Sequence, residues 1–334
     1  MKIRFYTAAA LIVFATTLHA QYTDIINSHR PGTSQGAFAV GYNVIQAEVG
    51  LTFGKDKHDL LQTESNVFST DYTIRYGLLY ERLEVNITGQ YLSENVTDNS
   101  GLVPYDYKQS NFRSNTIGAK FLLYDPYKER DKEGPNLYSW RANNKFRWRE
   151  LIPAVSVYGG VNLDTKDNPF LPPDDGMTYK ALVSTQINME GAFVFVTNII
   201  ADRITSEYPT YSYILTLTHA FNPRFSAFVE NQGIMSDWYA DQLFRFGAAY
   251  LFSPDFQVDI LATTNFKDTP SKFYVSAGVS YRYDMHTDPK PKDQEQDEID
   301  KALKKAEKEA KKKRKNKDFE DGVDEEEQNL DDEQ

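Results

Sequence analysis

Eight charged side chains stand at alternating positions of otherwise apolar segments, and their types and spacing could do chemistry. They are Glu48, Arg75, Glu84, Lys120, Glu230, Arg245, Asp259 and Arg282. Each directly follows an apolar or aromatic residue, and a strand sends successive side chains to opposite faces. Opposite charges gathered on one face can pair with one another or select permeating solutes. We therefore predict that these eight residues line a pore.

Three of these residues lie on consecutive predicted strands. Mirror pairing about the intervening turns would bring Glu230, Arg245 and Asp259 to similar depths. The sequence therefore predicts a carboxylate–guanidinium–carboxylate ladder. Such a ladder would either brace the interior of a barrel or form a constriction that selects solutes.

Other kinds of chemistry find less support. The chain has no Cys and five His, and no second His stands at a fixed spacing from His219, although Thr216 and Thr218 are close to it. No phosphate-binding glycine loop, metal-ligand spacing or dinucleotide fingerprint occurs. We expect no enzymatic activity, no cofactor and no metal site. The net charge of −11 also argues against nucleic acid as a partner.

The stretch Lys272–Tyr283 shows most clearly how such residues would be positioned. Its odd-numbered residues are apolar or aromatic, whereas most of those between them are small or polar. This period of two suits a strand between lipid and a polar lumen. The stretch also resembles the assembly signal on the last strand of bacterial outer-membrane barrels. The matching residues are Ser276, Gly278, Tyr281 and Tyr283, and the resemblance implies the barrel-assembly machinery as a partner during biogenesis.

Eleven earlier segments repeat the alternation, so the sequence predicts an all-β fold, a transmembrane antiparallel β-barrel of about twelve strands over residues 44–283. The segments are 44–53, 70–79, 83–91, 115–124, 154–163, 178–188, 192–200, 211–218, 225–231, 242–251 and 256–264. The 22 Tyr and 21 Phe suit aromatic girdles at two membrane interfaces. The rival fold is a soluble periplasmic sandwich.

Short and long connections alternate, which is typical of outer-membrane barrels with periplasmic turns and external loops. With an even number of strands, both termini would be periplasmic, and the barrel would contact the lipids of the outer membrane of a Gram-negative bacterium. The connection 125–151 is too long for a periplasmic turn. Its mixture of aromatic and basic residues favours either a short interfacial helix or an extended hairpin, or else a strand that begins early, near Lys145.

The ends of the chain differ from the barrel region. Residues 1–20 read as a signal peptide with cleavage after Ala20, and residues 21–43 as an irregular periplasmic lead-in. Residues 284–334 carry a basic block followed by an acidic one, which predicts a disordered or helical charged periplasmic tail. The tail is either only a solvated extension or a tether to a periplasmic protein or the cell wall.

Two motifs carry a family resemblance. Residues 28–35, SHRPGTSQ, followed by Gln46, Glu48 and Gly50 on the first strand, resemble the outer-membrane transporter family named after the meta-pathway of phenol degradation. His29 stands where the family has Asp. The resemblance implies an outer-membrane barrel that passes small, often hydrophobic molecules. We expect a passive or gated channel or transporter; the alternative is a non-conducting accessory barrel that contacts periplasmic partners through 125–151 and the tail.

Overall fold

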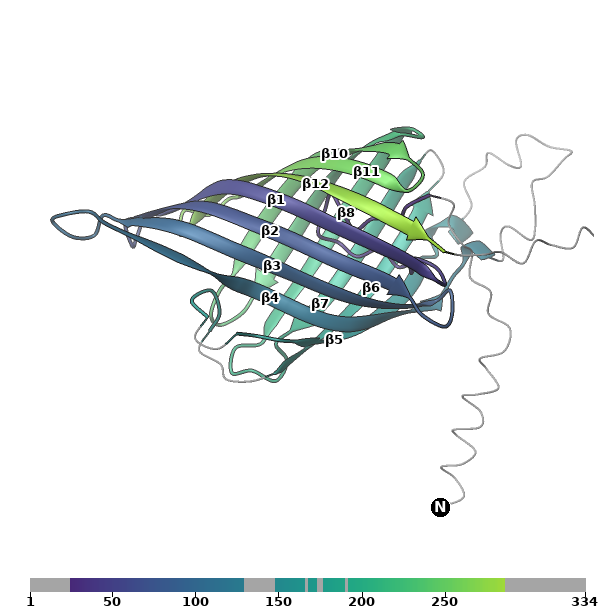
Figure 1. The fold of residues 1–334 in the computed structure, drawn as a ribbon, viewed down its shortest axis with the longest axis horizontal. Helices are drawn as coiled ribbons and strands as arrows, with labels where there is room; N and C mark the ends of the chain where they lie inside the picture. The colour runs from purple at the N-terminus through teal and green to yellow at the C-terminus, as the bar shows by residue number, and fades with distance from the viewer. Residues whose placement is uncertain (1–24, 129–147, 166–167, 173–176, 190–191, 286–334) are drawn as a thin grey trace, which may run out of the picture. The chain divides into compact units, whose positions relative to one another are not determined.

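The computed structural model describes residues 25–128, 148–165, 168–172, 177–189 and 192–285, and their strands form one closed antiparallel barrel (Figure 1). The strands are β1 (Val44–His58), β2 (Thr63–Gly77), β3 (Leu83–Asp98), β4 (Tyr105–Tyr124), β5 (Ala154–Asn162), β6 (Thr178–Met189), β7 (Phe193–Asp202), β8 (Thr210–Asn222), β9 (Phe225–Met235), β10 (Asp241–Ser253), β11 (Phe256–Asn265) and β12 (Ser271–Asp284). Each strand pairs with its neighbours in sequence, and β12 pairs with β1 to close the ring. The prediction of a twelve-stranded barrel is confirmed.

The two faces of each strand differ as the alternation predicts. On β1, Val49, Leu51 and Phe53 are 41%, 44% and 60% exposed, whereas Glu48 and Thr52 at the alternate positions are buried on the inner face. Large apolar side chains cover the outside of the barrel on every strand. A soluble protein buries such side chains. Apolar side chains outside and polar side chains inside are the arrangement of a transmembrane barrel whose outer surface meets lipid.

The first four strands are longer than the sequence predicts. Most of residues 54–66 and 92–114, which we expected to be loops, continue the hairpins β1–β2 and β3–β4, with pairing as far as His58↔Thr63 and Asp98↔Tyr105. These hairpins project beyond the neighbouring strands in Figure 1. Beyond the apolar band no lipid demands alternation, so the hydrophobic pattern fades although backbone pairing continues.

The connection after β4 is described only at its two ends, because residues 129–147 lie outside the described part. Trp148–Leu151 forms a single 3₁₀ turn, and β5 begins at Ala154. A strand running continuously from Lys145 is therefore wrong, and the predicted helix or hairpin falls mostly on residues that are not described. Among the described residues, no helix combines the length and apolarity needed to span a membrane.

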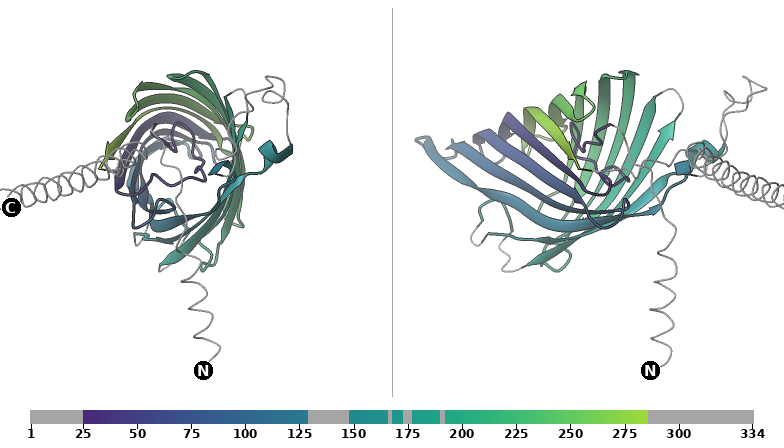
Figure 2. Two further views of the ribbon diagram at one scale, coloured as in Figure 1. Left: turned by 90° about the vertical axis from the view of Figure 1, so that its right-hand side faces the viewer. Right: turned by 45° about the vertical axis from the view of Figure 1, so that its right-hand side comes forward.

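Residues 25–43, hereafter the N-terminal segment, lie inside the ring of strands. Figure 2 (left) shows them in purple within the barrel. They enter at the end that carries the connections 78–82, 223–224 and 254–255, which we call the turn end; the opposite end is the loop end. Ile26 donates a hydrogen bond to the carbonyl of Pro254 there (2.8 Å). The predicted signal peptide lies outside the described residues, as does the predicted charged tail from residue 286 onward; Asp284, expected to begin the tail, is the last residue of β12.

Candidate functional site

All eight predicted pore-lining residues are buried on the inner face of the barrel, at 8% exposure or less. Four of them form one network near the turn end. Arg75 contacts Glu84 at 2.7 Å and Glu48 at 3.4 Å, and Lys120 lies 3.4 Å from Glu84. These residues come from β1, β2, β3 and β4. Because a buried charge is costly without a partner, the network satisfies four charges together.

The other four have separate partners. Arg245 contacts Glu230 at 2.9 Å, and Arg282 contacts Asp255 at 2.7 Å. The second half of the predicted ladder is wrong: Asp259 lies opposite Ala249, four residues along β10 from Arg245. Asp259 instead binds Arg30, a residue that precedes the first strand.

Arg30 is the main ionic anchor of the N-terminal segment. Its guanidinium donates two hydrogen bonds to the Asp259 carboxylate, at 2.9 and 3.1 Å. It lies against Gly50 on β1 and Gly278 on β12, which are paired across the barrel closure. A Cβ atom on either glycine would overlap the guanidinium. The two glycines therefore leave the space in which the fork-shaped ion pair forms.

Glu230 is a second anchor. Its carboxylate accepts hydrogen bonds from the backbone N–H groups of Thr33 and Ser34, at 3.1–3.2 Å, and from the Thr33 hydroxyl at 2.7 Å. It also accepts one from Thr216 and one from Arg245. An ionised carboxylate bonds only as an acceptor, so this site suits a cluster of donors.

The rest of the N-terminal segment is held all around the ring. Further bonds join Asn27 to Gln46 and Arg75, His29 to Glu48, Gln35 to Asn198, Ala37 to Gln186, and Val40 to Glu84. Buried backbone groups need such partners. The inward polar side chains of the wall therefore bind this segment, and the bound segment fills the lumen near the turn end.

Sequence reasoning missed this role of the lead-in. It also missed Gln186 and Asn198, which are uncharged but point inward and are buried. Gln186 and Asn198 could have been found from the sequence, because both stand at inward-facing alternate positions of predicted strands. For the lead-in, the clue was Arg30 followed by Pro31 and Gly32 in a stretch without strand alternation.

His29 lies within the charged network near the turn end. Its backbone N–H bonds Glu48 at 3.2 Å, and its ring Nε2 lies 3.4 Å from the Lys120 ammonium. Burial, followed by the positive charges of Arg75 and Lys120, lowers the pKa of His29 well below its ordinary value, although Glu84 opposes this. His29 is therefore neutral in the folded barrel near pH 7.

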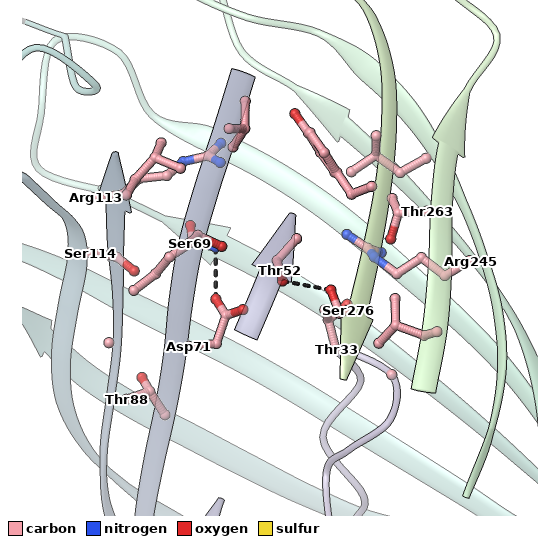
Figure 3. A pocket seen from close by; sticks show the side chains of 18 of the residues that line it. Thr33, Thr52, Ser69, Asp71, Thr88, Arg113, Ser114, Arg245, Thr263 and Ser276 are labelled. Atoms are coloured by element: carbon pink, nitrogen blue, oxygen red, sulfur yellow. Dashed lines mark hydrogen bonds between the residues drawn. The ribbon is translucent and has the colours of Figure 1, made fainter. Parts of the chain in front are cut away.

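A cavity of about 540 Å³ lies above the N-terminal segment, toward the loop end. Arg30, Pro31, Gly32 and Thr33 line its floor, and β1–β4 and β10–β12 supply most of its wall. In Figure 3, Arg113 and Arg245 stand on opposite sides of it. This size lies within the range of small-molecule sites, roughly 300–1,000 Å³.

The inner wall is not polar throughout. Tyr158, Leu182, Ile200 and Ile214 form a buried apolar cluster on β5–β8. Tyr158 lies opposite Lys120 and Leu182, so it shares the inward face with them. The wall of β5–β8 therefore combines this apolar cluster with polar side chains, among them Gln186, Asn198 and the ion pair of Lys180 with Asp202.

The remaining histidines have different surroundings. His58 lies at the end of β1, where its Nδ1 accepts a hydrogen bond from Leu61. His219 stacks on Phe193 at 4.2 Å and contacts Phe221. His286 lies outside the described residues, and within the described ones no group of three His, Asp or Glu could hold a metal ion.

The four residues of the predicted assembly signal divide between the two faces of β12. Ser276 is buried and bonds Thr52 at 2.5 Å, and Gly278 faces Arg30. Tyr281 and Tyr283 are 52% and 55% exposed on the outer face. Their role in assembly stays a prediction.

Several solved structures are similar to this barrel. The COG4313 outer membrane channel from Pseudomonas putida F1 has 10% identity and a TM-score of 0.51, over 77% of this chain and 100% of that chain. The NanC porin has 8% identity and a TM-score of 0.44, over 70% and 98%. The CymD monoaromatic hydrocarbon channel has 9% identity and a TM-score of 0.36, over 74% and 90%.

The first of these structures shares the fold of an outer-membrane β-barrel with this chain. No curated protein matches the sequence. The model of the family described as "Putative MetA-pathway of phenol degradation" matches residues 28–283, which include the Arg30 motif, the first strand and the whole barrel. The chain belongs to this family.

Proposed function

We propose that the protein is a non-enzymatic outer-membrane channel for small molecules, and that its N-terminal segment gates the channel. One observation carries the proposal: the segment fills the lumen near the turn end through hydrogen bonds to wall side chains, while a cavity remains open above it. Polar anchors of this kind can be exchanged for water one at a time, unlike a packed apolar core.

Family membership supports this proposal, and the similar barrel from Pseudomonas putida F1 is an outer membrane channel. We propose the outer membrane of a Gram-negative bacterium as its location, with the turn end facing the periplasm. Twelve strands lie between the filled eight-stranded barrels and the open sixteen-stranded porins, which agrees with a narrow lumen that one segment can close.

The test compares the full mature chain with a variant lacking residues 25–40 in planar lipid bilayers. The full chain should give small or infrequent current steps, and the deletion should give larger and longer ones. Because the twelve strands are retained, altered migration of unheated samples on denaturing gels checks that the barrel has folded. A folded deletion variant that gives no steps would contradict a channel.

The accessory role is the alternative outcome of the same experiment. The segments proposed to bind periplasmic partners are 125–151 and 284–334, and residues 129–147 and 286–334 of them lie outside the described residues. A silent barrel that co-purifies with a periplasmic protein, and loses that protein when residues 284–334 are removed, would favour the accessory role instead.

A further inference from the structure

Hydroxyl groups from five neighbouring strands line one side of the cavity above the N-terminal segment. They belong to Thr52 on β1, Ser69 on β2, Thr88 on β3, Thr263 on β11 and Ser276 on β12, and Figure 3 shows them around one space. Within the described part of the chain, the hydroxyls of Ser69, Thr88 and Thr263 make no hydrogen bond. A hydroxyl group can both donate and accept, so these three are open to bond a solute in the cavity.

Neither sign of charge dominates the described lining of the cavity. It holds four carboxylates and four cations, which are Glu48, Asp56, Asp71, Glu94, Arg30, Arg113, Arg245 and Lys272. Arg30 and Arg245 are bound to carboxylates, and Asp56 lies opposite Lys272 across the pairing of β1 with β12. The cavity therefore does not select an ion of one sign, and what it offers a solute is hydrogen bonding.

Aromatic rings reach the cavity from connections at the loop end. Phe170 lies in the connection between β5 and β6, Trp238 lies in the one between β9 and β10, and both line the cavity. Trp238 is 56% exposed, so its indole presents free apolar surface. Aromatic rings bury flat apolar groups well. The solute that fits here therefore has an apolar face as well as hydrogen-bonding groups.

Two further rings lie above the cavity on the projecting hairpin of β3 and β4. Tyr105 and Tyr107 stack with their ring centres 6.0 Å apart. They alternate along β4 with Gln109, whose amide bonds the carboxylate of the cavity residue Glu94 at 3.0 Å, so all three share the inner face of the strand. A solute with an apolar face would meet these rings before it reaches Trp238.

We infer that the solute of this cavity is a small neutral saccharide. A pyranose ring carries hydroxyl groups around its edge and C–H groups on its faces, so its edge matches Ser69, Thr88 and Thr263 and one face matches Trp238. A hydrocarbon would displace water from the three hydroxyls without replacing its hydrogen bonds, which loses affinity. The inference rests on the proposed channel and names its class of solute, which differs from the hydrophobic molecules that the family resemblance implies.

The test is calorimetric titration of the purified full chain in a detergent whose head group is not a sugar. The probes are the methyl β-pyranosides of glucose and galactose, sorbitol, which has hydroxyl groups but no ring, and cyclohexanol, which has a ring but a single hydroxyl group. We expect at least one pyranoside to bind about tenfold more tightly than sorbitol or cyclohexanol, because only a pyranoside uses the rings and several hydroxyls together. Equal affinities for all probes, or no binding of either pyranoside, would overturn the inference.

Two variants locate the bound pyranoside. Trp238→Ala should weaken it about tenfold through the lost ring, and Thr263→Val about fivefold through the lost hydroxyl. Trp148→Ala is the control for the ring, because Trp148 is exposed in the 3₁₀ turn before β5 and does not line the cavity. Thr185→Val is the control for the hydroxyl, because Thr185 alternates with buried residues on the outer face of β6. Gel migration verifies folding, and unchanged affinity in both folded cavity variants would reject the site.

Bilayer recordings of the same preparations separate this inference from the proposed function. Current steps without pyranoside binding would overturn the saccharide site and leave the channel. Pyranoside binding without current steps, in both the full chain and the deletion of residues 25–40, would overturn the channel and leave the site.

Discussion

Gly50 and Gly278 face each other across the pairing of β1 with β12, and the Arg30 guanidinium lies over both. The absence of two side chains on the wall thus allows one side chain of the N-terminal segment to reach Asp259. Gln46 and Glu48, which precede Gly50 at alternate positions of β1, bond Asn27 and His29. The motif of Gln46, Glu48 and Gly50 on the first strand is therefore a binding surface for the segment that precedes it.

Replacing Gly50 by Ala should displace Arg30 from Asp259. The added methyl group overlaps the guanidinium, and overpacking of this kind costs typically about 1–3 kcal/mol. In bilayer recordings, we expect the variant to conduct more often than the native chain. Gly159→Ala is the matched control, because a Cβ at Gly159 meets nothing within 4 Å, and identical recordings for the two variants would contradict the role of Gly50.

The Asp259→Asn substitution should weaken the hold on the N-terminal segment more strongly. Asp259 has a fully buried carboxylate, and its partner Arg30 is 11% exposed. Removing one partner of a buried pair costs about 3–5 kcal/mol of stability. The cost here is smaller than that if Arg30, once unpaired, moves into water. Urea titration of the barrel in detergent measures the decrease in the free energy of unfolding. The exposed pair of Lys57 and Asp59 supplies a control, since Lys57→Gln should cost less than about 1 kcal/mol.

Glu230→Gln should release the middle of the N-terminal segment. An amide has one acceptor oxygen in place of two and adds donors, which would face the N–H groups of Thr33 and Ser34. Because the native chain has no Cys, a single Ser34→Cys substitution reports access without background. Maleimide should label this buried position slowly alone and faster together with Glu230→Gln. Equal labelling rates would show that Glu230 does not hold the segment.

Acid should loosen the N-terminal segment through His29. The folded barrel lowers the pKa of His29, so the released segment binds the proton more readily than the docked one. Docking is therefore most stable above the ordinary pKa of about 6.5 and weakens as the pH falls below it, toward the lowered value. The ring faces Lys120 and Arg75, while Glu48 and Glu84 supply the opposing charge.

The measurement for His29 is channel activity as a function of pH. Activity should rise between about pH 6.5 and pH 5 in the native chain, and His29→Gln should flatten this rise. His58 lies at the far end of β1, where it bonds Leu61 and not the N-terminal segment, so His58→Gln should retain the native response. An unchanged response in His29→Gln would assign the acid sensitivity to another group.

The last strand allows a test of biogenesis. Replacing both Tyr281 and Tyr283 by Ala should lower the amount of folded barrel in the outer membrane, because it removes the aromatic end of the predicted assembly signal. Tyr250→Ala, another exposed aromatic of the outer face, controls for the loss of a ring. Equal amounts of folded protein, measured by gel migration of membrane fractions, would count against the signal.

The strands could be predicted because lipid imposes a strict alternation on every crossing, as in Val44–Phe53 and Lys272–Tyr283. The same rule placed Arg75, Lys120 and Glu230 inside. It could not reveal their partners, because Arg30 lies in a stretch that lipid does not constrain and its contact with Asp259 spans 229 residues of sequence. The strand extensions that end near His58 and Asp98 could not be predicted for a related reason. Outside the bilayer, both faces of a strand meet water, so the sequence does not alternate.

The anchors of the N-terminal segment also bear on the order of folding. Ser28 bonds Ser280 across 252 residues, and Arg30 bonds Asp259 across 229. Contacts between such distant residues form late, because the chain between them must first be ordered. A chain released before its last two strands are synthesised would lack both contacts. The segment that leads the protein in sequence would thus be the last part to settle, and its docking would mark the completion of the ring.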